Sequence, residues 1–302
     1  MIAGLAAALP PGRSLWARIT RRILVLVAVL LVVLSAVPAP IWIYALGAGA
    51  VAAWLLMLGR ERPASRQRTV TALRVVVPLV ALLAVASEVP YQASPRLSRA
   101  KHDPVYIIGD SLSADVAGNI QPWPALLARD HGLSVANLAT AGATLKEGRR
   151  QVQRLLDEHG IVVVLLGGND LITRRDVAQF ERDLDYVLAR AASVGRQVVM
   201  FELPLPPLAN GYGYVQRRLA ARCGVTLIPR RCLAWLLARP SATIDGLHLS
   251  SQGHAVLADL VWRCIGDACQ VTPKPATNRR SPPEREAPAG VAAGRARWRF
   301  RF

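Results

Sequence analysis

Ser111, Asp245 and His248 are the residues of this sequence whose types and spacing suit acyl transfer. Ser111 follows an apolar run that ends at Gly109, and Asp245 precedes His248 by three residues. A serine becomes a nucleophile when a histidine takes its proton, and that histidine is oriented by a carboxylate. The alternative for Ser111 alone is a capping role at the start of a helix over residues 112–120, since serine caps helices well.

Two further stretches can stabilise the negative charge that acyl transfer develops on the carbonyl oxygen. Gly142 follows a predicted strand, and Asn169 lies near the end of the run "IVVVLLGGND". Backbone N–H groups at Ser111 and Gly142 and the side-chain amide of Asn169 are donors of the type found in oxyanion holes. Taken singly, Gly142 and Asn169 are equally well interpreted as turn residues.

The elements that would position these residues alternate along residues 103–270. Apolar runs predict strands near residues 105–109, 134–139, 161–168, 197–204 and 225–229, and the intervening segments have helical spacing. Strands that alternate with helices indicate a mostly parallel sheet covered by helices on both faces, a three-layer α/β/α fold. Such a sheet has its active site at the carboxyl ends of its strands, where the serine, glycine and asparagine fall.

In chain order, these stretches resemble the motif blocks of the SGNH hydrolases, also called the GDSL esterase/lipase family. The matching residues are Gly109–Leu112, Gly142, Gly167–Asp170 and Asp245–His248. The resemblance covers about residues 103–268 and implies a flavodoxin-like fold. It also implies catalytic roles for Ser111, Asp245 and His248, and an oxyanion hole formed by Ser111, Gly142 and Asn169.

The activity implied by the resemblance is two-step acyl transfer from a carboxylic ester through an acyl-serine, without metal or cofactor. The family's substrates include lipids, thioesters and acetylated glycans. Two alternatives stay open: an O-acyltransferase that uses the same triad on a sugar hydroxyl, and a membrane-anchored polymer-binding module without catalysis. A water-excluding acceptor site would indicate the transferase, and a missing triad residue would indicate the non-catalytic module.

The net charge of +17 on 302 residues is concentrated at the two ends of the chain. Residues 1–90 carry +7 and residues 271–302 carry +6, whereas the long middle part carries only +4. A nucleic-acid-binding protein usually concentrates basic residues on a folded face, so this distribution argues against a nucleic-acid partner. Basic ends beside apolar segments are more typical of a protein at a membrane surface.

Residues 23–89 contain three candidate transmembrane helices. Residues 23–37 and 41–58 are free of charge, and the turn Pro38–Pro40 separates them. A third apolar stretch covers residues 70–89, with Pro78 inside it. A bilayer core needs about 20 apolar residues, which the second and third stretches approach most closely. The alternatives are a cleaved signal peptide in place of the first span, and a buried helix in place of the third.

Basic residues on the cytoplasmic side set the predicted orientation. Four arginines lie in residues 13–22, before the first span, and four more lie in residues 60–68, after the second. The basic segment 1–22 is therefore predicted to be cytoplasmic, with the turn at residues 38–40 outside. If residues 70–89 also cross, the catalytic domain lies on the outer side of an inner membrane, after a linker at residues 90–102.

The remaining sequence features are the cysteines and the tail. Cys223, Cys232, Cys264 and Cys269 allow three disulfide connectivities, of which the local pairs 223–232 and 264–269 are favoured over four free thiols. The tail, residues 271–302, is rich in Pro, Arg, Ala and Gly and is predicted to be disordered. The oligomeric state cannot be derived from any of these patterns.

Overall fold

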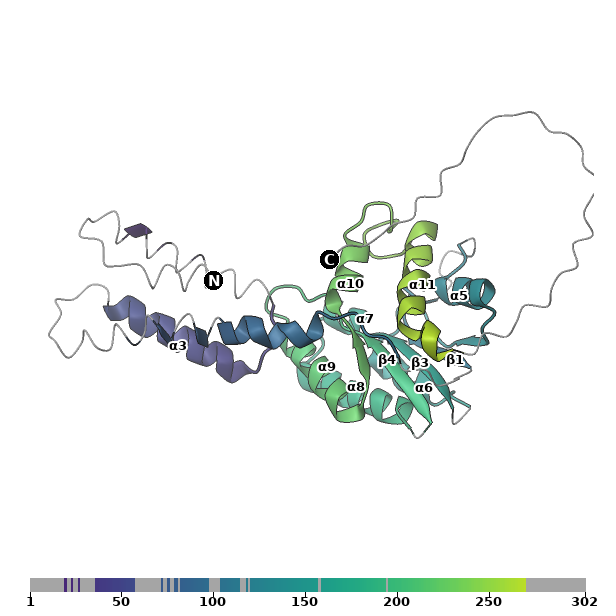
Figure 1. The fold of residues 1–302 in the computed structure, drawn as a ribbon, viewed down its shortest axis with the longest axis horizontal. Coiled ribbons are helices and arrows are strands. Elements are labelled where there is room, and N and C mark those ends of the chain that lie inside the picture. Colours follow the sequence, from purple (N-terminus) through teal and green to yellow (C-terminus); the bar gives the residue numbers. More distant parts are fainter. Residues whose placement is uncertain are drawn as a thin grey trace, which may run out of the picture. The chain divides into compact units, whose positions relative to one another are not determined.

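The computed structural model describes residues 36–57, 82–97, 104–114, 120–156, 159–193 and 195–269, with ten isolated residues at 19, 20, 23, 27, 72, 75, 76, 79, 80 and 118. A parallel sheet of five strands forms the centre of the domain, in the order β2-β1-β3-β4-β5 (Figure 1). The strands are β1 Val105–Gly109, β2 Val135–Asn137, β3 Gly160–Leu165, β4 Arg196–Phe201 and β5 Thr226–Ile228.

The central strands form because their sequences are apolar without interruption. Every residue of β1 and β3 is buried, and Ile107 pairs with Val163 in the parallel register between them. Strands covered on both faces require such continuous apolar runs, whereas a half-exposed strand alternates polar and apolar residues. The predicted three-layer α/β/α arrangement with a parallel sheet is confirmed.

Helices cover both faces of the sheet and complete two hydrophobic cores (Figure 1). One face is packed by α6 Leu145–Val152, α8 Val177–Ala191 and α9 Asn210–Cys223. The other is packed by α5 Trp123–His131, α10 Arg230–Leu237 and α11 Ser251–Ile265, which continues into η2 Gly266–Ala268. The short helix α7 Gly168–Ile172 follows the carboxyl end of β3.

Three local features differ from the sequence-based expectation. No helix begins in the described residues after Ser111, because residues 111–113 form a turn in which the N–H groups of Ser113 and Ala114 donate to the Asp110 carbonyl. Helix α6 ends at Val152 instead of continuing to Gly160, as its last turn tightens into bonds between residues three apart. Helix α10 follows β5 and was not expected.

The N-terminal region contributes helix α3 Ile41–Met57, a helical stretch over residues 82–88, and the single turn η1 Val89–Tyr91. Helix α3 has 17 residues, and no helix within the described residues is long and apolar enough to cross a membrane. Most of the predicted first span and the arginine-rich segments around residues 13–22 and 60–68 lie outside the described residues. So do parts of residues 70–89 and the tail from residue 270.

None of the four cysteines forms a disulfide, so the local disulfide pairs favoured from the sequence are wrong. Cys223 packs against the core under α8 and α9, whereas Cys232 packs against the core under α10 and α11. The sheet therefore stands between the two members of one predicted pair. Burial raises the pKa of the Cys264 thiol to about 12, which keeps it protonated and unreactive.

Candidate active site

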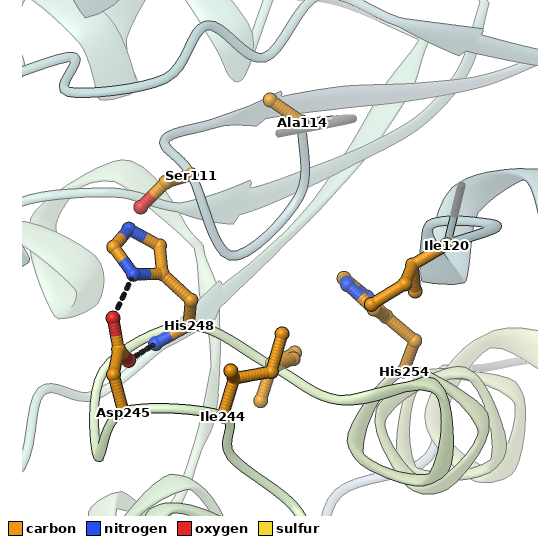
Figure 2. A pocket seen from close by; sticks show the side chains of 8 residues that line it. Ser111, Ala114, Ile120, Ile244, Asp245, His248 and His254 are labelled. Atoms are coloured by element: carbon orange, nitrogen blue, oxygen red, sulfur yellow. Dashed lines mark hydrogen bonds and ion pairs between the residues drawn. The ribbon is translucent and has the colours of Figure 1, made fainter. Parts of the chain in front are cut away.

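Ser111 lies in the turn that leaves the carboxyl end of β1. The Asp110 carbonyl accepts the N–H groups of Ser113 and Ala114, and the Asp110 carboxylate accepts the N–H of Leu112 at 3.0 Å. These bonds turn the chain sharply, so the Ser111 side chain points away from the sheet. Its hydroxyl faces a ring nitrogen of His248 (Figure 2).

The other ring nitrogen of His248 is held by Asp245. His248 Nδ1 lies 2.6 Å from Asp245 Oδ2, and Asp245 Oδ1 accepts the backbone N–H groups of His248 at 2.7 Å and Leu247 at 2.9 Å. The backbone N–H of His248, its imidazole and the N–H of Leu247 hold the pKa of the Asp245 carboxyl far below its ordinary value. An ionised Asp245 fixes the tautomer that leaves Nε2 free to accept the serine proton.

A compact loop closes around this Asp–His pair. An antiparallel bridge joins Thr243 to Leu249, and Gly246 adopts a φ of 86° at the tip of the loop. Ser250 then caps α11, because its side chain accepts the N–H of Gly253 at 3.1 Å. A side chain at Gly253 would lie 2.0 Å from the Ala242 carbonyl oxygen, so glycine lets the loop pack onto the helix.

A pocket of about 190 Å³ opens between the serine turn and this loop (Figure 2). Its polar lining consists of the predicted triad together with His254, and its apolar lining is Ala114, Ile120, Ile244 and Leu249. His254 Nδ1 accepts the backbone N–H of Trp123 at 3.2 Å. Sequence alone indicates only a helix residue at position 254, whereas the structure places it in the pocket wall.

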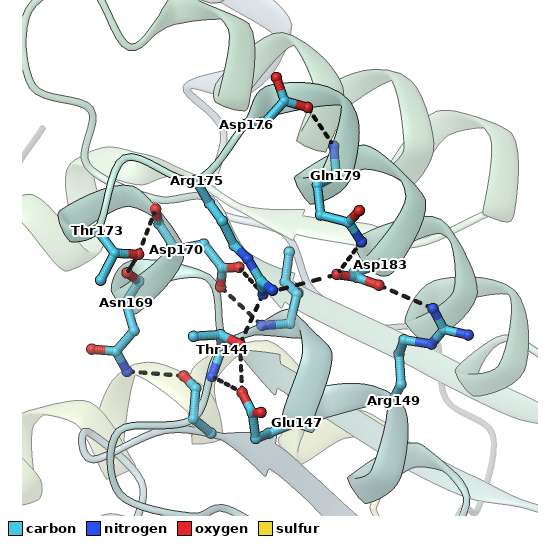
Figure 3. A network of polar contacts seen from close by, with 12 residues as sticks. Thr144, Glu147, Arg149, Asn169, Asp170, Thr173, Arg175, Asp176, Gln179 and Asp183 are labelled. Atoms are coloured by element: carbon cyan, nitrogen blue, oxygen red, sulfur yellow. Dashed lines mark hydrogen bonds and ion pairs between the residues drawn. The ribbon is translucent and has the colours of Figure 1, made fainter.

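The two predicted oxyanion-hole residues beyond the serine lie on neighbouring loops. Gly142 has a φ of 72° in the turn after β2, and Asn169 is the second residue of α7. The Asn169 side-chain amide donates to the Ala143 carbonyl at 2.9 Å, so the two loops are joined (Figure 3). Neither residue lines the pocket, and their action on a substrate oxygen stays a prediction.

A buried ionic network lies beside this junction (Figure 3). Asp170 is fully buried and accepts the N–H of Leu145 at 2.8 Å and the guanidinium of Arg175 at 3.3 Å. The same guanidinium donates to the Thr144 hydroxyl at 3.1 Å. Burial raises the pKa of the Asp170 carboxyl, while Leu145 and Arg175 oppose that rise.

One further group in contact with the serine turn was not identified from the sequence. The Gln151 side chain brackets Gly109, accepting its N–H at 3.0 Å and donating to its carbonyl at 2.9 Å. The feature of the sequence that could have indicated this contact is the position of the polar Gln151 on the buried face of α6. Burial also raises the pKa of Asp110 to about 6.

Residues 107–256 match the model of the GDSL-like Lipase/Acylhydrolase family. The folded domain therefore belongs to this family, and its class is that of the SGNH/GDSL-type, esterase-like hydrolases that act on ester bonds.

Curated relatives include the esterase TesA of Pseudomonas aeruginosa, which is 28% identical over 169 residues, covering 52% of this chain and 84% of TesA. The thioesterase 1/protease 1/lysophospholipase L1 of Escherichia coli is 28% identical over 167 residues, covering 52% of this chain and 80% of that protein. A crystal structure of TesA superposes with a TM-score of 0.46 at 26% identity, over 52% of this chain and 95% of that one.

Proposed function

We propose that this protein is a membrane-anchored serine esterase that cleaves carboxylic esters through an acyl-Ser111 intermediate. The observation that carries the proposal is the arrangement of Ser111, His248 and Asp245 around one pocket, with His248 Nδ1 held 2.6 Å from Asp245. This geometry leaves the second nitrogen of His248 facing the serine hydroxyl (Figure 2).

In the acylation step, Ser111 Oγ attacks the carbonyl carbon of the ester while its proton passes to His248 Nε2. The carbonyl oxygen becomes an oxyanion, for which the N–H groups of Ser111 and Gly142 and the Asn169 amide are the proposed donors. Asn169 already gives one amide hydrogen to Ala143, which leaves the second for the substrate. Collapse of the intermediate breaks the bond to the alcohol, which leaves with the proton from His248.

In the second step, water gives a proton to His248 and attacks the acyl-serine, releasing the acid and restoring the Ser111 hydroxyl. The side chains of His248 and Asp245 are 42% and 51% exposed, so water reaches the base directly. This exposure favours hydrolysis over transfer to a sugar hydroxyl, because a transferase must keep water from its acyl-enzyme. The complete triad also argues against the non-catalytic alternative.

The membrane anchor is proposed from the uncharged residues of α3 and from the contacts that residues 36 and 37, just before this helix, make with the catalytic domain. Arg230 donates to the Ala36 carbonyl at 2.8 Å, and Asn210 donates to the Val37 carbonyl at 3.2 Å. These carbonyls lie beside the turn at residues 38–40, which the arginine distribution assigns to the outer side of an inner membrane. A domain in contact with that turn must lie on the same side, which supports a third crossing by residues 70–89.

The substrate class of the proposed reaction includes lipid esters, thioesters and acetylated envelope glycans. The relatives' names, esterase, arylesterase and thioesterase/lysophospholipase, support an acyl ester without selecting one of these. The decisive experiment is turnover of p-nitrophenyl esters of increasing acyl length by the purified full chain in detergent. Ser111→Ala should reduce turnover by about 10³-fold or more.

A serine-directed phosphonate gives a second readout of the same proposal. The wild-type chain should be labelled covalently, and folded Ser111→Ala protein should not. Equal turnover by the wild type and Ser111→Ala would overturn the serine mechanism. Labelling without turnover on any ester would favour the acyltransferase.

A further inference from the structure

Two separate parts of the N-terminal region dock onto the same part of the catalytic domain. The first is the turn before α3, whose Ala36 and Val37 carbonyls accept bonds from Arg230 and Asn210. The second is Glu88, at the end of the helical stretch over residues 82–88. Its carboxylate accepts from Arg217 at 2.6 Å and from Arg230 at 3.1 Å.

This docking is closely fitted and not a loose surface contact. Arg217 is 5% exposed, donates to buried Glu202 at 2.5 Å as well as to Glu88, and lies 3.8 Å above the Tyr91 ring. Buried charges are rarely left without partners in proteins, so separation of Glu88 would leave Arg217 underpaired. A side chain at Gly213 would come within 2.8 Å of Pro38, so this glycine lets the turn approach α9.

The docking residues lie at the edge of the sheet that also carries the active site. Glu202 follows β4 directly, Asn210 begins α9 after the β4 loop, and Arg230 begins α10 immediately after β5. Because all strands are parallel, their carboxyl ends share one edge, and Ser111 follows β1 at that edge. The N-terminal helices therefore meet the domain on the side where the pocket opens.

Exposed apolar side chains collect around the same edge. Ile172, Leu208, Ile244 and Leu247 are 55–80% exposed and lie in the segments after β3, after β4 and in the His248 loop. We call these four residues the apolar rim. Scattered exposed hydrophobic residues are ordinary, but several at one edge of a domain, with Ile244 also lining the pocket, are typical of an interaction site.

Leu208 is the most informative member of the apolar rim. It is 80% exposed and has a φ of 68°, a left-handed conformation that leucine rarely adopts. It stands two residues before Asn210, so consecutive Cα spacing keeps it within about 8 Å of the residue that binds the Val37 carbonyl. A strained backbone thus presents an apolar side chain beside the point where the predicted membrane segment attaches.

We propose that the carboxyl edge of the domain faces the bilayer, with the apolar rim inserted at its surface, and that the substrate is an amphiphilic ester resident in that bilayer. This inference rests on the membrane anchor of the proposed function. The pocket of about 190 Å³ is smaller than those that enclose drug-sized ligands, which begin near 300 Å³. A long acyl chain would therefore stay in the lipid while its ester enters the pocket between Ile244 and His248.

The first test measures position and does not depend on activity. Full-length Leu208→Trp is reconstituted in phosphatidylcholine vesicles with and without brominated acyl chains, and its fluorescence is compared with that of the wild type. The matched control is Leu156→Trp, since Leu156 is 88% exposed but lies between α6 and β3 at the opposite edge. Additional quenching is expected at position 208 only.

Equal quenching of the two added tryptophans would overturn the proposal. A blue shift at position 208 without quenching would also overturn it, because the side chain would then be covered by protein, such as a second copy of the chain. Because the wild-type tryptophans are common to both variants, only the difference between the variants is interpreted.

The second test measures substrate class in the same vesicles. Leu208→Glu should lower hydrolysis of a fluorogenic long-chain ester dissolved in the vesicles by about tenfold, the cost of removing one leucine from an apolar phase. The rate at which Leu208→Glu hydrolyses water-soluble p-nitrophenyl acetate should stay within about twofold of the wild-type rate. A twofold change is smaller than the effect of losing a single hydrogen bond. Leu156→Glu should change neither rate.

The results separate failure of this inference from failure of the proposed function. Parallel loss of both activities in Leu208→Glu, or loss of neither, would overturn the membrane-facing rim while leaving the esterase intact. If the wild type hydrolyses neither ester, the proposed function fails. The quenching comparison would still decide whether the carboxyl edge of the domain faces the bilayer. Asn210→Ala gives an independent check, because loss of its bond to the Val37 carbonyl should loosen the docked turn and lower only the long-chain activity.

Discussion

The two halves of the candidate site are built in opposite ways. The loop over residues 241–250 carries Asp245 and His248 at an exposed position, and bonds between residues two to nine positions apart hold it together. The loops after β2 and β3 carry Gly142 and Asn169, and contacts between residues 25 to 31 positions apart join them through buried Asp170 and Arg175 (Figure 3).

Because of this difference, substitutions in the two halves of the site should have different effects on the stability of the fold. The base is positioned by the local path of the chain, so its residues can be altered without disturbing the core. The proposed oxyanion donors depend on a buried ionic network, where removal of one partner leaves the other charged and desolvated. Variants with comparable losses of activity should therefore differ sharply in their free energy of unfolding.

Among the variants that keep Ser111, Asp245→Asn is expected to give the largest effect on activity. Asparagine can still accept the backbone N–H groups, but its amide would face His248 Nδ1 and stabilise the wrong tautomer. The expected loss in kcat is about 10⁴-fold on p-nitrophenyl acetate, with the melting temperature nearly unchanged because the loop is exposed. The matched control is Asp185→Asn. Asp185 lies on the surface of α8 and pairs with Arg222, so this variant should keep full activity.

A marked drop in melting temperature for Asp245→Asn would contradict the view that this loop is structurally independent of the core. Full activity in the variant would remove Asp245 from the triad.

Asp170→Ala should affect both properties. It leaves the Leu145 N–H without its buried acceptor and Arg175 without its nearer carboxylate, with only Asp183 remaining at 3.9 Å, so we expect a loss of about 3–5 kcal/mol in the free energy of unfolding. Activity should also fall, because the two loops that carry the proposed oxyanion donors lose the bond between Asp170 and the Leu145 N–H. Urea denaturation followed by circular dichroism, together with kcat at low temperature, measures both effects.

Asp183→Ala is the matched control for this prediction. Asp183 is equally buried, but it lies on α8 and accepts side-chain bonds from Arg149 at 3.1 Å and Gln179 at 2.9 Å, with Arg175 farther away at 3.9 Å. It should lose stability while retaining more activity than Asp170→Ala. Equal activity in the two variants would show that the Asp170 junction does not position the site.

The same contrast explains which features could be predicted from the sequence. The Asp245–His248 pair is visible because both partners lie within four residues, and the buried strands are visible because β1 and β3 are uninterrupted apolar runs. The Gln151 bracket around Gly109 joins residues 42 positions apart, and periodicity gives no information on such a pairing. Helix α10 also escaped prediction, since its eight residues are too few for a clear helical repeat.

Docking of the N-terminal region could not be predicted for a related reason. Arg217 has the charge of an ordinary exposed residue, and only the fold shows that it is buried between Glu88 and Glu202. The contact between Asn210 and Val37 spans 173 positions. Contacts between residues so far apart in the sequence depend on how the helices and the sheet pack in the folded protein. Local sequence patterns carry no information on this packing.

Asn169→Ala isolates the chemical contribution of the buried half. The substitution removes one proposed oxyanion donor and the bond to the Ala143 carbonyl, and kcat is expected to fall by about 10²–10³-fold with little change in KM. Thr173→Ala is the control in the same turn, because the Thr173 hydroxyl donates to the backbone carbonyls of Asn169 at 2.7 Å and Asp170 at 3.3 Å and leaves the Asn169 side chain in place. Full activity in Asn169→Ala would remove this residue from the oxyanion hole.

The effect predicted for Asp110 is on stability, and it is expressed as a pH dependence. Burial raises its pKa from 3.8 to about 6, opposite in direction to the shift of exposed Asp245. The folded protein therefore keeps this proton up to about pH 6, while the unfolded chain releases it near pH 4. The resulting stabilisation is complete below pH 4 and is lost as the pH rises through about 6.

The Asp110→Asn variant lacks this titration. The free energy of unfolding of the wild type relative to the variant should fall by about 3 kcal/mol between pH 4 and pH 7, as measured by urea denaturation at each pH. A difference that stays constant, or rises with pH, would mean that Asp110 is ionised throughout and is stabilised by the Leu112 N–H more than it is penalised by burial. In that case the ionisation of Asp110 would be governed by backbone N–H donors, as it is for Asp245 in its exposed loop. It would not be governed by burial, as it is for Asp170.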